Sequence, residues 1–374
     1  MMWIDLRRFT FLATLILAPA LTGCGRKDAS SHTTGTASNP PPSSAPSGLM
    51  AIPAQASVVV ETKAMGTLIR IVTYPTQALN EAATRRSVAK AMEELRRIET
   101  LMSPRREDSD VSRINHHAGT WVPVSQDTFR VVEKGLWAGS VSGGTFDITW
   151  ATMADLWKFG ETGEPQPALP SADEVTKRRA LVDYSRVEIR PTTLEVRIPE
   201  GRRVGLGGIA KGYGVDRAAD VLRREGLRSF LFQAGGDIFA SGTKPDGTPW
   251  VTGIMDPRGP EGSHFATLEL GDCALSTAGD YERYYIANGK RYHHIIDPRT
   301  GYPATASRSV SVIAPSAMVS DAIDDAVFIL GPEKGMALVE SLPDVGAVIV
   351  DGNNKVWISE RLRGKVTVIK EPTP

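Results

Sequence analysis

Segments typical of strands and of helices follow one another along this chain without a regular β–α–β alternation. Two runs rich in β-branched residues, 58–62 and 68–74, flank a glycine bend, and a long helical pattern covers about 77–102. Further along, runs at 345–350 and 356–359 flank an Asp-Gly turn and are typical of a hairpin. Hairpins build antiparallel sheets, whereas parallel sheets need a crossover between successive strands. The sequence therefore predicts an α+β fold with mixed, largely antiparallel sheets and packed helices.

The N-terminal residues have the layout of an export signal. Two arginines precede the apolar run Phe9–Leu21, which is too short to span a bilayer. The next residues, Leu21–Cys24, resemble the lipobox of bacterial lipoproteins. That resemblance implies a signal peptide at 1–23, a lipid on Cys24 and a membrane-anchored protein that faces the periplasm or the cell exterior. An ordinary signal peptide with a chance cysteine is the alternative, and the paired arginines leave a twin-arginine route open.

Residues 24–57 are rich in Ser, Thr, Pro, Ala and Gly, a composition that buries no core and is typical of a disordered tether. The folded part is therefore expected at 58–374. Lys+Arg and Asp+Glu both number 43, and no basic block occurs, which argues against a nucleic-acid partner. If Cys24 carries lipid, Cys273 stands alone and no intramolecular disulfide can form.

The stretch Leu275–Pro303 holds the densest group of chemically active side chains. His294 stands three residues before Asp297, and a Pro and a Gly predict a turn directly after that aspartate. An extended segment of this kind can hold an imidazole and a carboxylate at one rim of a pocket. Neighbours in an extended segment point to opposite sides, so only one of His293 and His294 can face the pocket. The alternative is that these side chains are solvated surface groups.

Two further stretches are rich in glycine. The run Gly205–Gly214 leads into a helix predicted over about 213–224. Its free backbone N–H groups, the positive end of the helix and Lys211 together predict a phosphate site. A flexible glycine loop is the alternative. Later in the chain, Gly235-Gly236 predict a tight bend that presents the carboxylate of Asp237.

Asp321 and Asp325 stand four residues apart at the start of a helix predicted from about Ser320. This spacing puts both carboxylates on one helix face, where like charges repel and favour a cation such as Mg²⁺, which prefers oxygen ligands. The equally weighted alternative is that acidic residues simply stabilise a helix N-terminus.

Taken in chain order, four of these motifs resemble those of the ApbE family, the FAD:protein FMN transferases. The four are Gly207–Gly212, Ala234–Asp237, His294–Gly301 and Asp321–Ala322. Shorter similarities extend the resemblance over roughly 58–366, namely Met65–Thr67, Asp108–Asn115 and Phe146–Asp147. The resemblance implies a single flavin transferase domain at 58–374. Such an enzyme cleaves the FAD pyrophosphate, moves FMN onto a Thr or Ser hydroxyl of a target flavoprotein and releases AMP.

Carried over residue by residue, the resemblance also implies a site. FAD would be bound by Met65, Phe146, Asp147, Lys211, Thr277 and Ile295. Mg²⁺ would be held by the Gly208 carbonyl, Asp321 and Asp325. The base that accepts the hydroxyl proton would be His294, with Asp297 as a second catalytic residue. The residue chemistry agrees, because phosphoryl transfer needs charge neutralisation and a weak hydroxyl nucleophile needs a base such as imidazole.

The chain departs from the family pattern at four positions. Asp325 stands where the family commonly has Thr, and Gly205, Ala278 and Arg105 stand where it often has Asp, Ser and an aromatic residue. These departures bear on flavin affinity and metal preference more than on the reaction.

Two other functions are compatible with the same residues. One is hydrolysis of FAD to FMN and AMP, with water in place of the protein hydroxyl. The other is flavin binding by a non-catalytic lipoprotein. Storage of a flavin needs no base, so the histidine and the acidic pair favour catalysis. The identity of the acceptor protein is not encoded in this chain.

Overall fold

One antiparallel sheet of eight strands organises the protein. The computed structural model describes residues 56–159 and 168–374. The spatial order of the strands is β1 (Val58–Ala64), β2 (Thr67–Thr73), β6 (Phe230–Ala234), β7 (Asp237–Ser241), β10 (Cys273–Gly279), β15 (Ser307–Ala314), β16 (Gly346–Asp351) and β17 (Val356–Ile358). Each neighbouring pair in this order is antiparallel. The predicted α+β class with largely antiparallel sheets is confirmed.

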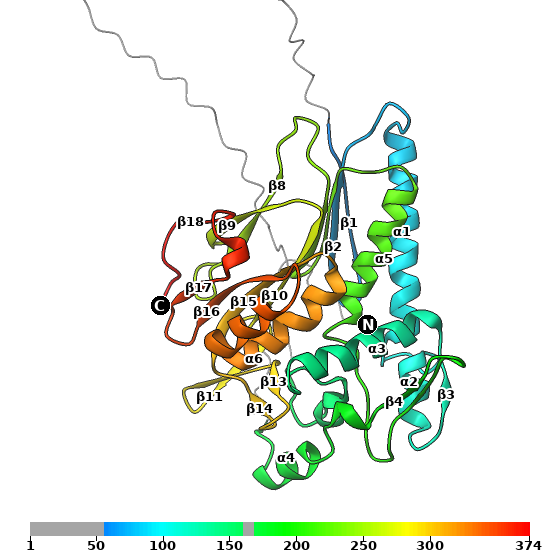
Figure 1. Ribbon diagram of the computed structural model, residues 1–374, viewed down its shortest axis with the longest axis vertical. Coiled ribbons are helices and arrows are strands. Elements are labelled where there is room, and N and C mark those ends of the chain that lie inside the picture. The colour runs from blue at the N-terminus through cyan, green and yellow to red at the C-terminus, as the bar shows by residue number, and fades with distance from the viewer. Residues whose placement is uncertain (1–55, 160–167) are drawn as a thin grey trace, which may run out of the picture.

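Three long helices cover one face of this sheet (Figure 1). They are α1 (Glu81–Met102), α5 (Ala210–Arg224) and α6 (Ala317–Ser341). Helix α1 begins where the Asn80 side chain accepts the N–H of Ala83, and its apolar stripe, which includes Val88 and Leu95, is buried. The long helix predicted near the start of the fold is confirmed, with a slightly later beginning.

A second, smaller sheet covers the opposite face. Its strands, in spatial order, are β18 (Val366–Val368), β9 (His264–Leu270) and β8 (Trp250–Met255). Side chains of β6 alternate between the two sides: Phe230 and Phe232 pack with the helices, and Leu231 packs with Trp250 and Phe265 of the small sheet. The large sheet is therefore the buried middle layer of three.

A lobe of shorter elements packs beside α6. It contains α2 (Asp110–His116), β3 (Val122–Pro123), α3 (Gln126–Val141), η1 (Ile148–Met153), α4 (Ala172–Arg179), η2 (Tyr184–Arg186), β4 (Glu188–Arg190) and β5 (Glu195–Arg197). One further short helix, η3 (Glu360–Leu362), lies outside the lobe and follows β17. Ser109 and Ser125 cap α2 and α3, and Ser171 forms a capping box with Glu174 at α4.

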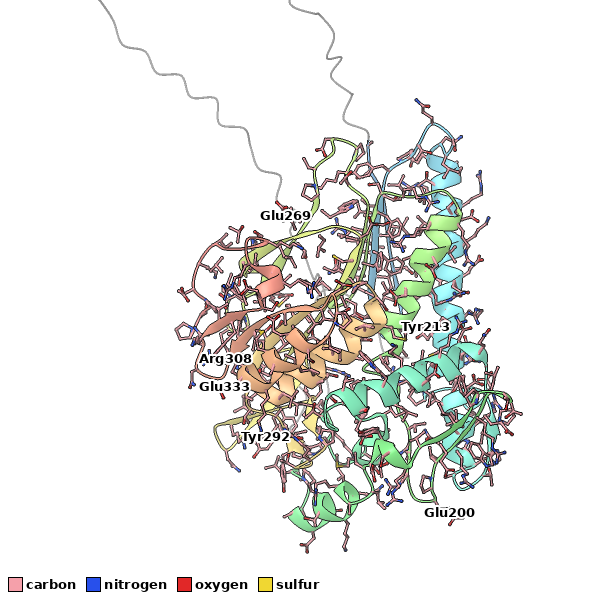
Figure 2. All side chains as sticks on the ribbon, in the orientation of Figure 1. Glu200, Tyr213, Glu269, Tyr292, Arg308 and Glu333 are labelled. Atoms are coloured by element: carbon pink, nitrogen blue, oxygen red, sulfur yellow. The ribbon has the colours of Figure 1, made fainter. Side chains whose placement is uncertain are left out.

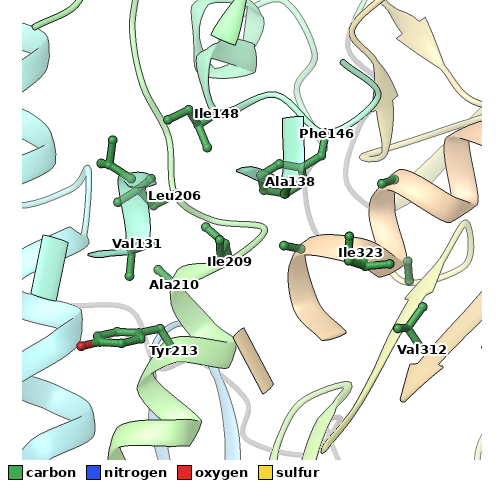
Figure 3. Packing of buried hydrophobic residues seen from close by; sticks show 14 of the residues in the cluster. Val131, Ala138, Phe146, Ile148, Leu206, Ile209, Ala210, Tyr213, Val312 and Ile323 are labelled. Carbon is green, nitrogen blue, oxygen red and sulfur yellow. The ribbon is translucent and has the colours of Figure 1, made fainter. Parts of the chain in front are cut away.

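The lobe joins the main layers through one continuous hydrophobic cluster (Figure 3). Phe146 of the lobe, Ile209 before α5 and Ile323 of α6 all belong to it. The loop that leads into α5 is therefore held between the lobe and α6, and this is where the candidate site lies.

The stretch Leu275–Pro303 begins in β10 and then leaves the main sheet. It forms one hairpin from β11 (Tyr284–Ala287) and β12 (Lys290–His293), and a second short pair from β13 (Ile296–Asp297) and β14 (Tyr302–Pro303). The first hairpin turns at Asn288 and Gly289, whose φ angles of 51° and 73° suit those residue types. His294 thus lies in the link between two small hairpins.

Within residues 56–159 and 168–374, no helix is long and apolar enough to cross a membrane. The predicted signal peptide at 1–23, the lipid on Cys24 and almost all of the tether predicted at 24–57 lie outside the described residues.

Candidate active site

Helices α5 and α6 cap each other's N-termini, which fixes the position of Asp321. Neither N-cap residue makes a side-chain cap of its own. Instead Asp321 of α6 accepts the N–H of Gly212 in the first turn of α5 at 2.8 Å. In return, Asp216 of α5 accepts the N–H groups of Ala317 and Met318 at 2.7 and 2.9 Å. Both helices therefore begin about one turn earlier than the sequence predicted.

Lys211 lies between two carboxylates from different elements. Its ammonium forms an ion pair with Asp237, after β6, and another with Asp321 at 3.4 Å. Desolvation by itself would lower the pKa of Lys211, but the charges of Asp237 and Asp321 outweigh it and raise that pKa above its usual value. Lys211 is therefore a permanent positive charge. Its partners here are the protein's own carboxylates, so the predicted phosphate site already has acidic neighbours.

Ser276 makes close contacts with two carboxylates. Its Oγ lies 2.6 Å from Oδ1 of Asp237 and 2.6 Å from Oδ2 of Asp324. One hydroxyl hydrogen cannot serve both carboxylates, so a second proton is needed on one of them. Desolvation, followed by the charges of Asp325 and Asp321, raises the pKa of Asp324 well above its usual range. The raised pKa favours the protonated form of Asp324, so the expected arrangement is that Asp324 donates to Ser276 and Ser276 donates to Asp237.

Asp325 and Gly208 lie next to each other, as the metal prediction requires. A Cβ atom on Gly208 would lie 3.1 Å from Oδ2 of Asp325 and 3.3 Å from a ring carbon of Phe146. The bare backbone of glycine is what allows this close approach. Desolvation raises the pKa of Asp325 and of Asp321, which stands one turn earlier on the same helix. In the described part of the chain, however, no three His, Cys, Asp or Glu side chains are arranged to hold a metal ion.

The two adjacent histidines have different surroundings, as the alternation of an extended segment predicts. His293 is buried, its Nε2 lies 2.7 Å from the carbonyl oxygen of Ala304, and its ring packs edge-on against Phe328. His294 is partly buried, and its Nδ1 has no hydrogen-bond partner among the described residues. Desolvation and then the charge of Arg283 lower the pKa of His294 to about 3. The ring of His294 is therefore neutral and has an unengaged nitrogen.

Asp297, predicted to share a rim with His294, is engaged within its own turn. Its carboxylate accepts the backbone N–H and Nε of Arg299 at 2.9 Å and Nη2 at 2.8 Å. Its carbonyl oxygen accepts the N–H of Gly301 at 2.8 Å, which closes the predicted turn. No hydrogen bond in the described ranges joins Asp297 to His294. These contacts support a role in shaping the loop, and the catalytic role of Asp297 stays a prediction.

Two of the residues predicted to bind FAD lie beside the start of α5. Met65 forms the turn between β1 and β2 with a φ of 51°, and its sulfur would lie 2.9 Å from a Cβ atom on Gly214. Phe146 contacts Gly208, as described above. Together with Lys211 in the first turn of α5, three of the predicted flavin-binding residues therefore lie near the N-terminal end of this helix.

The other predicted FAD-binding residues have partners within the protein. The carboxylate of Asp147 accepts the N–H and hydroxyl of Thr149 at 2.7 and 2.6 Å and the N–H of Tyr184 at 2.9 Å. Thr277 shares a hydrogen bond with a serine of β15, and Ile295 is buried in the hydrophobic cluster. Any contact of these three residues with a flavin stays a prediction.

Glu282 and Arg283, to which the sequence assigned no role, also belong to the site. The N–H of His294 donates to the carbonyl oxygen of Arg283 at 3.1 Å, so the two residues oppose each other across the hairpin. Glu282 is exposed, and its Oε1 lies near Gly236, 3.5 Å from the position of a Cβ atom there. Desolvation raises its pKa to about 7, against the lowering effect of Lys211 and Arg283. The pairing of Arg283 with His294 at the open end of a hairpin was the signal that could have identified Arg283.

An open depression of about 500 Å³ lies apart from this group. It is bordered by Arg299, by the kink of α6 at Gly331 and Pro332, and by Trp357 of β17. None of the predicted flavin or metal ligands borders it. The depression therefore does not mark the candidate site, which is defined by the acidic residues around Lys211 and by His294.

Known proteins share the sequence pattern and the fold of this chain. The sequence profile of the ApbE family matches residues 65–349. This chain belongs to the ApbE family. Curated relatives named FAD:protein FMN transferase include those of Vibrio cholerae, 35% identical over 273 residues (72% of this chain, 81% of that protein), and Treponema pallidum, 32% identical over 326 residues (82% and 87%).

Solved structures of ApbE proteins have the same fold. The ApbE protein of Thermotoga maritima is 32% identical and superposes with a TM-score of 0.75, covering 83% of this chain and 99% of that one. The flavin transferase ApbE of Vibrio cholerae is 29% identical, with a TM-score of 0.72 and the same coverage. The predicted family, the single-domain fold and the transferase class are thereby confirmed.

Proposed function

We propose that this ApbE-family protein is a Mg²⁺-dependent FAD:protein FMN transferase. It would cleave the pyrophosphate of FAD, attach FMN to a Thr or Ser hydroxyl of a target flavoprotein and release AMP. The observation that carries the proposal is the neutral imidazole of His294 beside Arg283, whose charge also acts on Asp325 next to Gly208. The names of the curated relatives support the same reaction.

The chain offers positive charge for the pyrophosphate of FAD. Lys211 is permanently charged, and the guanidinium of Arg283 makes no hydrogen bond or ion pair with the described residues while influencing the pKa of both His294 and Asp325. Phosphoryl transfer depends mainly on such charge neutralisation and on positioning.

The donor set also fits Mg²⁺. The ion would be held by the Gly208 carbonyl, Asp321 and Asp325, which are hard oxygen ligands of the kind Mg²⁺ prefers. Desolvation raises the pKa of both carboxyls, and the positive charge of Lys211 offsets it only in part. When bound, Mg²⁺ would supply further neutralisation of phosphate charge. Asp325 gives this chain one more carboxylate than the family's usual Thr would.

In the proposed reaction, the acceptor hydroxyl oxygen forms a bond to the phosphorus of the FMN moiety. The bond from that phosphorus to the bridging oxygen breaks, and its electron pair leaves with AMP. The hydroxyl proton passes to the imidazole of His294, which the low pKa keeps neutral at neutral pH and therefore able to accept a proton. The negative charge of a bound pyrophosphate would raise that pKa and make His294 a stronger base.

The competing function is hydrolysis of FAD, in which water takes the place of the protein hydroxyl. The two are separated by incubating the purified chain with FAD, Mg²⁺ and a candidate acceptor flavoprotein, then measuring AMP, free FMN and protein-bound FMN. Transfer requires that AMP equal protein-bound FMN. AMP matched by free FMN instead would support hydrolysis, and FAD binding without AMP would support a storage protein.

We further propose that the protein is anchored by a lipid on Cys24 and acts outside the cytoplasmic membrane. The lipobox-like residues Leu21–Cys24 and the Ser/Pro-rich sequence behind them support this location. Such a tether would let the folded part reach acceptor proteins at the same membrane surface.

A further inference from the structure

The hairpin that leads into His294 depends on contacts outside itself. Strands β11 and β12 form a separate two-stranded sheet with four residue pairs. A two-stranded hairpin alone is only marginally stable in water. Its position relative to Lys211 and the acidic residues is therefore set by its contacts with the rest of the chain: Tyr285 and Tyr292 stack on Phe159 and Trp157, and hydrogen bonds hold its base.

Asp280 lies at the base of this hairpin and is held by four hydrogen bonds. The carboxylate is buried and accepts both Nη1 and Nη2 of Arg258 at 2.7 and 2.6 Å. Its backbone N–H donates to the carbonyl oxygen of Arg308 at 3.1 Å. Its carbonyl oxygen accepts Nη1 of Arg291, a β12 residue, at 3.3 Å. Tyr292 of the hairpin and Arg308 are both labelled in Figure 2.

The first support behind Asp280 runs through Arg258 to Asp256. Asp256 is 3% exposed and holds the Arg258 loop by accepting the N–H groups of Arg258 and Gly259 at 3.3 and 3.1 Å. The same carboxylate accepts Nζ of Lys370 at 2.7 Å and the hydroxyl and N–H of Thr373 at 2.8 and 3.0 Å. Residues 370–373 are thereby hydrogen-bonded to the loop that carries Arg258, the partner of Asp280.

The second support reaches the same segment by another route. Nη1 of Arg308, whose carbonyl accepts the Asp280 N–H, donates to Oδ1 of Asn354 at 2.9 Å. Nδ2 of Asn354 donates to the carbonyl oxygen of Pro372 at 2.7 Å. Both routes therefore begin at 370–373 and end on Asp280.

We propose that these two routes form a clamp that positions the His294 hairpin for the reaction. Arg258, Asp280 and Asn354 are positioning residues in this proposal: they touch no reacting atom and act through the hairpin. A bidentate Arg–carboxylate pair fixes orientation as well as distance, which suits that task. The kinetic part of the proposal rests on the proposed transferase function, whereas the placement of the hairpin does not.

The test compares Arg258→Met, Asp280→Asn, the double variant and Asn354→Ala with the parent chain. Amide hydrogen exchange of residues 284–294 measures the clamp without any flavin. It should accelerate about tenfold in each single variant, because local opening becomes easier. With FAD and acceptor, kcat should fall about 10- to 100-fold while the FAD dissociation constant stays within about threefold. The double variant should be no worse than Arg258→Met, because both act on one pair.

Two controls separate positioning from general destabilisation. Arg258→Lys keeps the charge and should recover part of kcat, and Arg197→Met, which removes an equally close pair with Glu188, should change neither exchange nor kcat. Unchanged exchange at 284–294 in Arg258→Met would overturn the clamp. If the parent chain transfers FMN and Arg258→Met accelerates exchange without changing kcat, the clamp has no positioning role. If the parent chain transfers no FMN, the proposed function is wrong, and the exchange result still shows whether the clamp holds the hairpin.

Discussion

The backbone N–H of His294 donates to the carbonyl oxygen of Arg283 at 3.1 Å, which makes the two residues direct neighbours across the hairpin. Residues paired in this way project to the same face of an antiparallel ribbon. The imidazole of His294, which is partly buried, and the guanidinium of Arg283 therefore share one face. The buried ring of His293 lies on the other face, toward the core. This arrangement separates the candidate base from its sequence neighbour.

Replacement of the two histidines should have opposite consequences. His294→Ala should lower transfer about 10²–10⁴-fold, the usual effect of losing a general base, with little change in FAD affinity. His293→Ala should lower the melting temperature, because it removes the bond to Ala304 and the contact with Phe328, but should keep the rate per folded molecule. Acceptor mass and thermal unfolding measure both effects. Severe loss of transfer in a well-folded His293→Ala protein would move the base assignment one residue upstream.

The pH dependence should differ between free enzyme and complex. A histidine with a pKa of about 3 is already neutral above pH 4, so kcat/KM should show no rising limb from His294 between pH 5 and 8. In the complex, the pyrophosphate raises the pKa of His294, so kcat should rise with pH as the ring loses its proton. A limb between pH 6 and 7 in kcat/KM would come from the carboxyls of Glu282, Asp321 and Asp325, whose pKa values are raised to about 7, 7 and 6. A limb in this range that disappeared only in His294→Gln would contradict the neutral His294 of the free enzyme.

The metal assignment is tested at Asp321 and Asp325. Asp321→Asn keeps an acceptor for the Gly212 N–H but removes charge, so calorimetry should show weaker Mg²⁺ binding and assays a loss of Mg²⁺-dependent turnover with little change in thermal stability. Asp216→Asn, which alters the matching cap on α6, is the control and should bind Mg²⁺ normally. Asp325→Thr restores the family's usual residue and should stay active. Complete inactivity of Asp325→Thr would show that this chain uses its additional carboxylate differently.

The location depends on a single residue in the N-terminal segment. Cys24→Ser should move the protein from the membrane to the soluble fraction of cell extracts, because the lipid is its main attachment. Immunoblots of both fractions, with the parent chain as control, measure this shift. A Cys24→Ser protein that stayed entirely with membranes would exclude the lipoprotein proposal.

Local signals predicted the elements that local contacts stabilise. Ser109, Ser125 and Ser171 each accept an N–H three residues ahead, so the sequence itself located the starts of α2, α3 and α4. The separation of His293 from His294 likewise follows from the alternation of an extended segment. Motif order indicated the family and hence the fold.

The features that the sequence missed depend on partners far apart in the chain. Helix α6 begins before Ser320 because Asp216, a residue of α5, supplies its cap. The two hydrogen bonds at Ser276 form only where Asp237 and Asp324 meet in the folded chain, and neither carboxylate is close to Ser276 in sequence. The clamp on Asp280 is likewise assembled only when the chain is folded. Propensity and spacing carry no information about such long-range contacts.

The most direct test of the account is the mass of an acceptor flavoprotein after incubation with this chain, FAD and Mg²⁺. The account predicts an increase equal to one FMN phosphate ester on a Thr or Ser, equimolar release of AMP, and rates of both about 10²–10⁴-fold lower with His294→Ala. An acceptor of unchanged mass beside AMP and free FMN in equal amounts would contradict it and identify the protein as an FAD hydrolase.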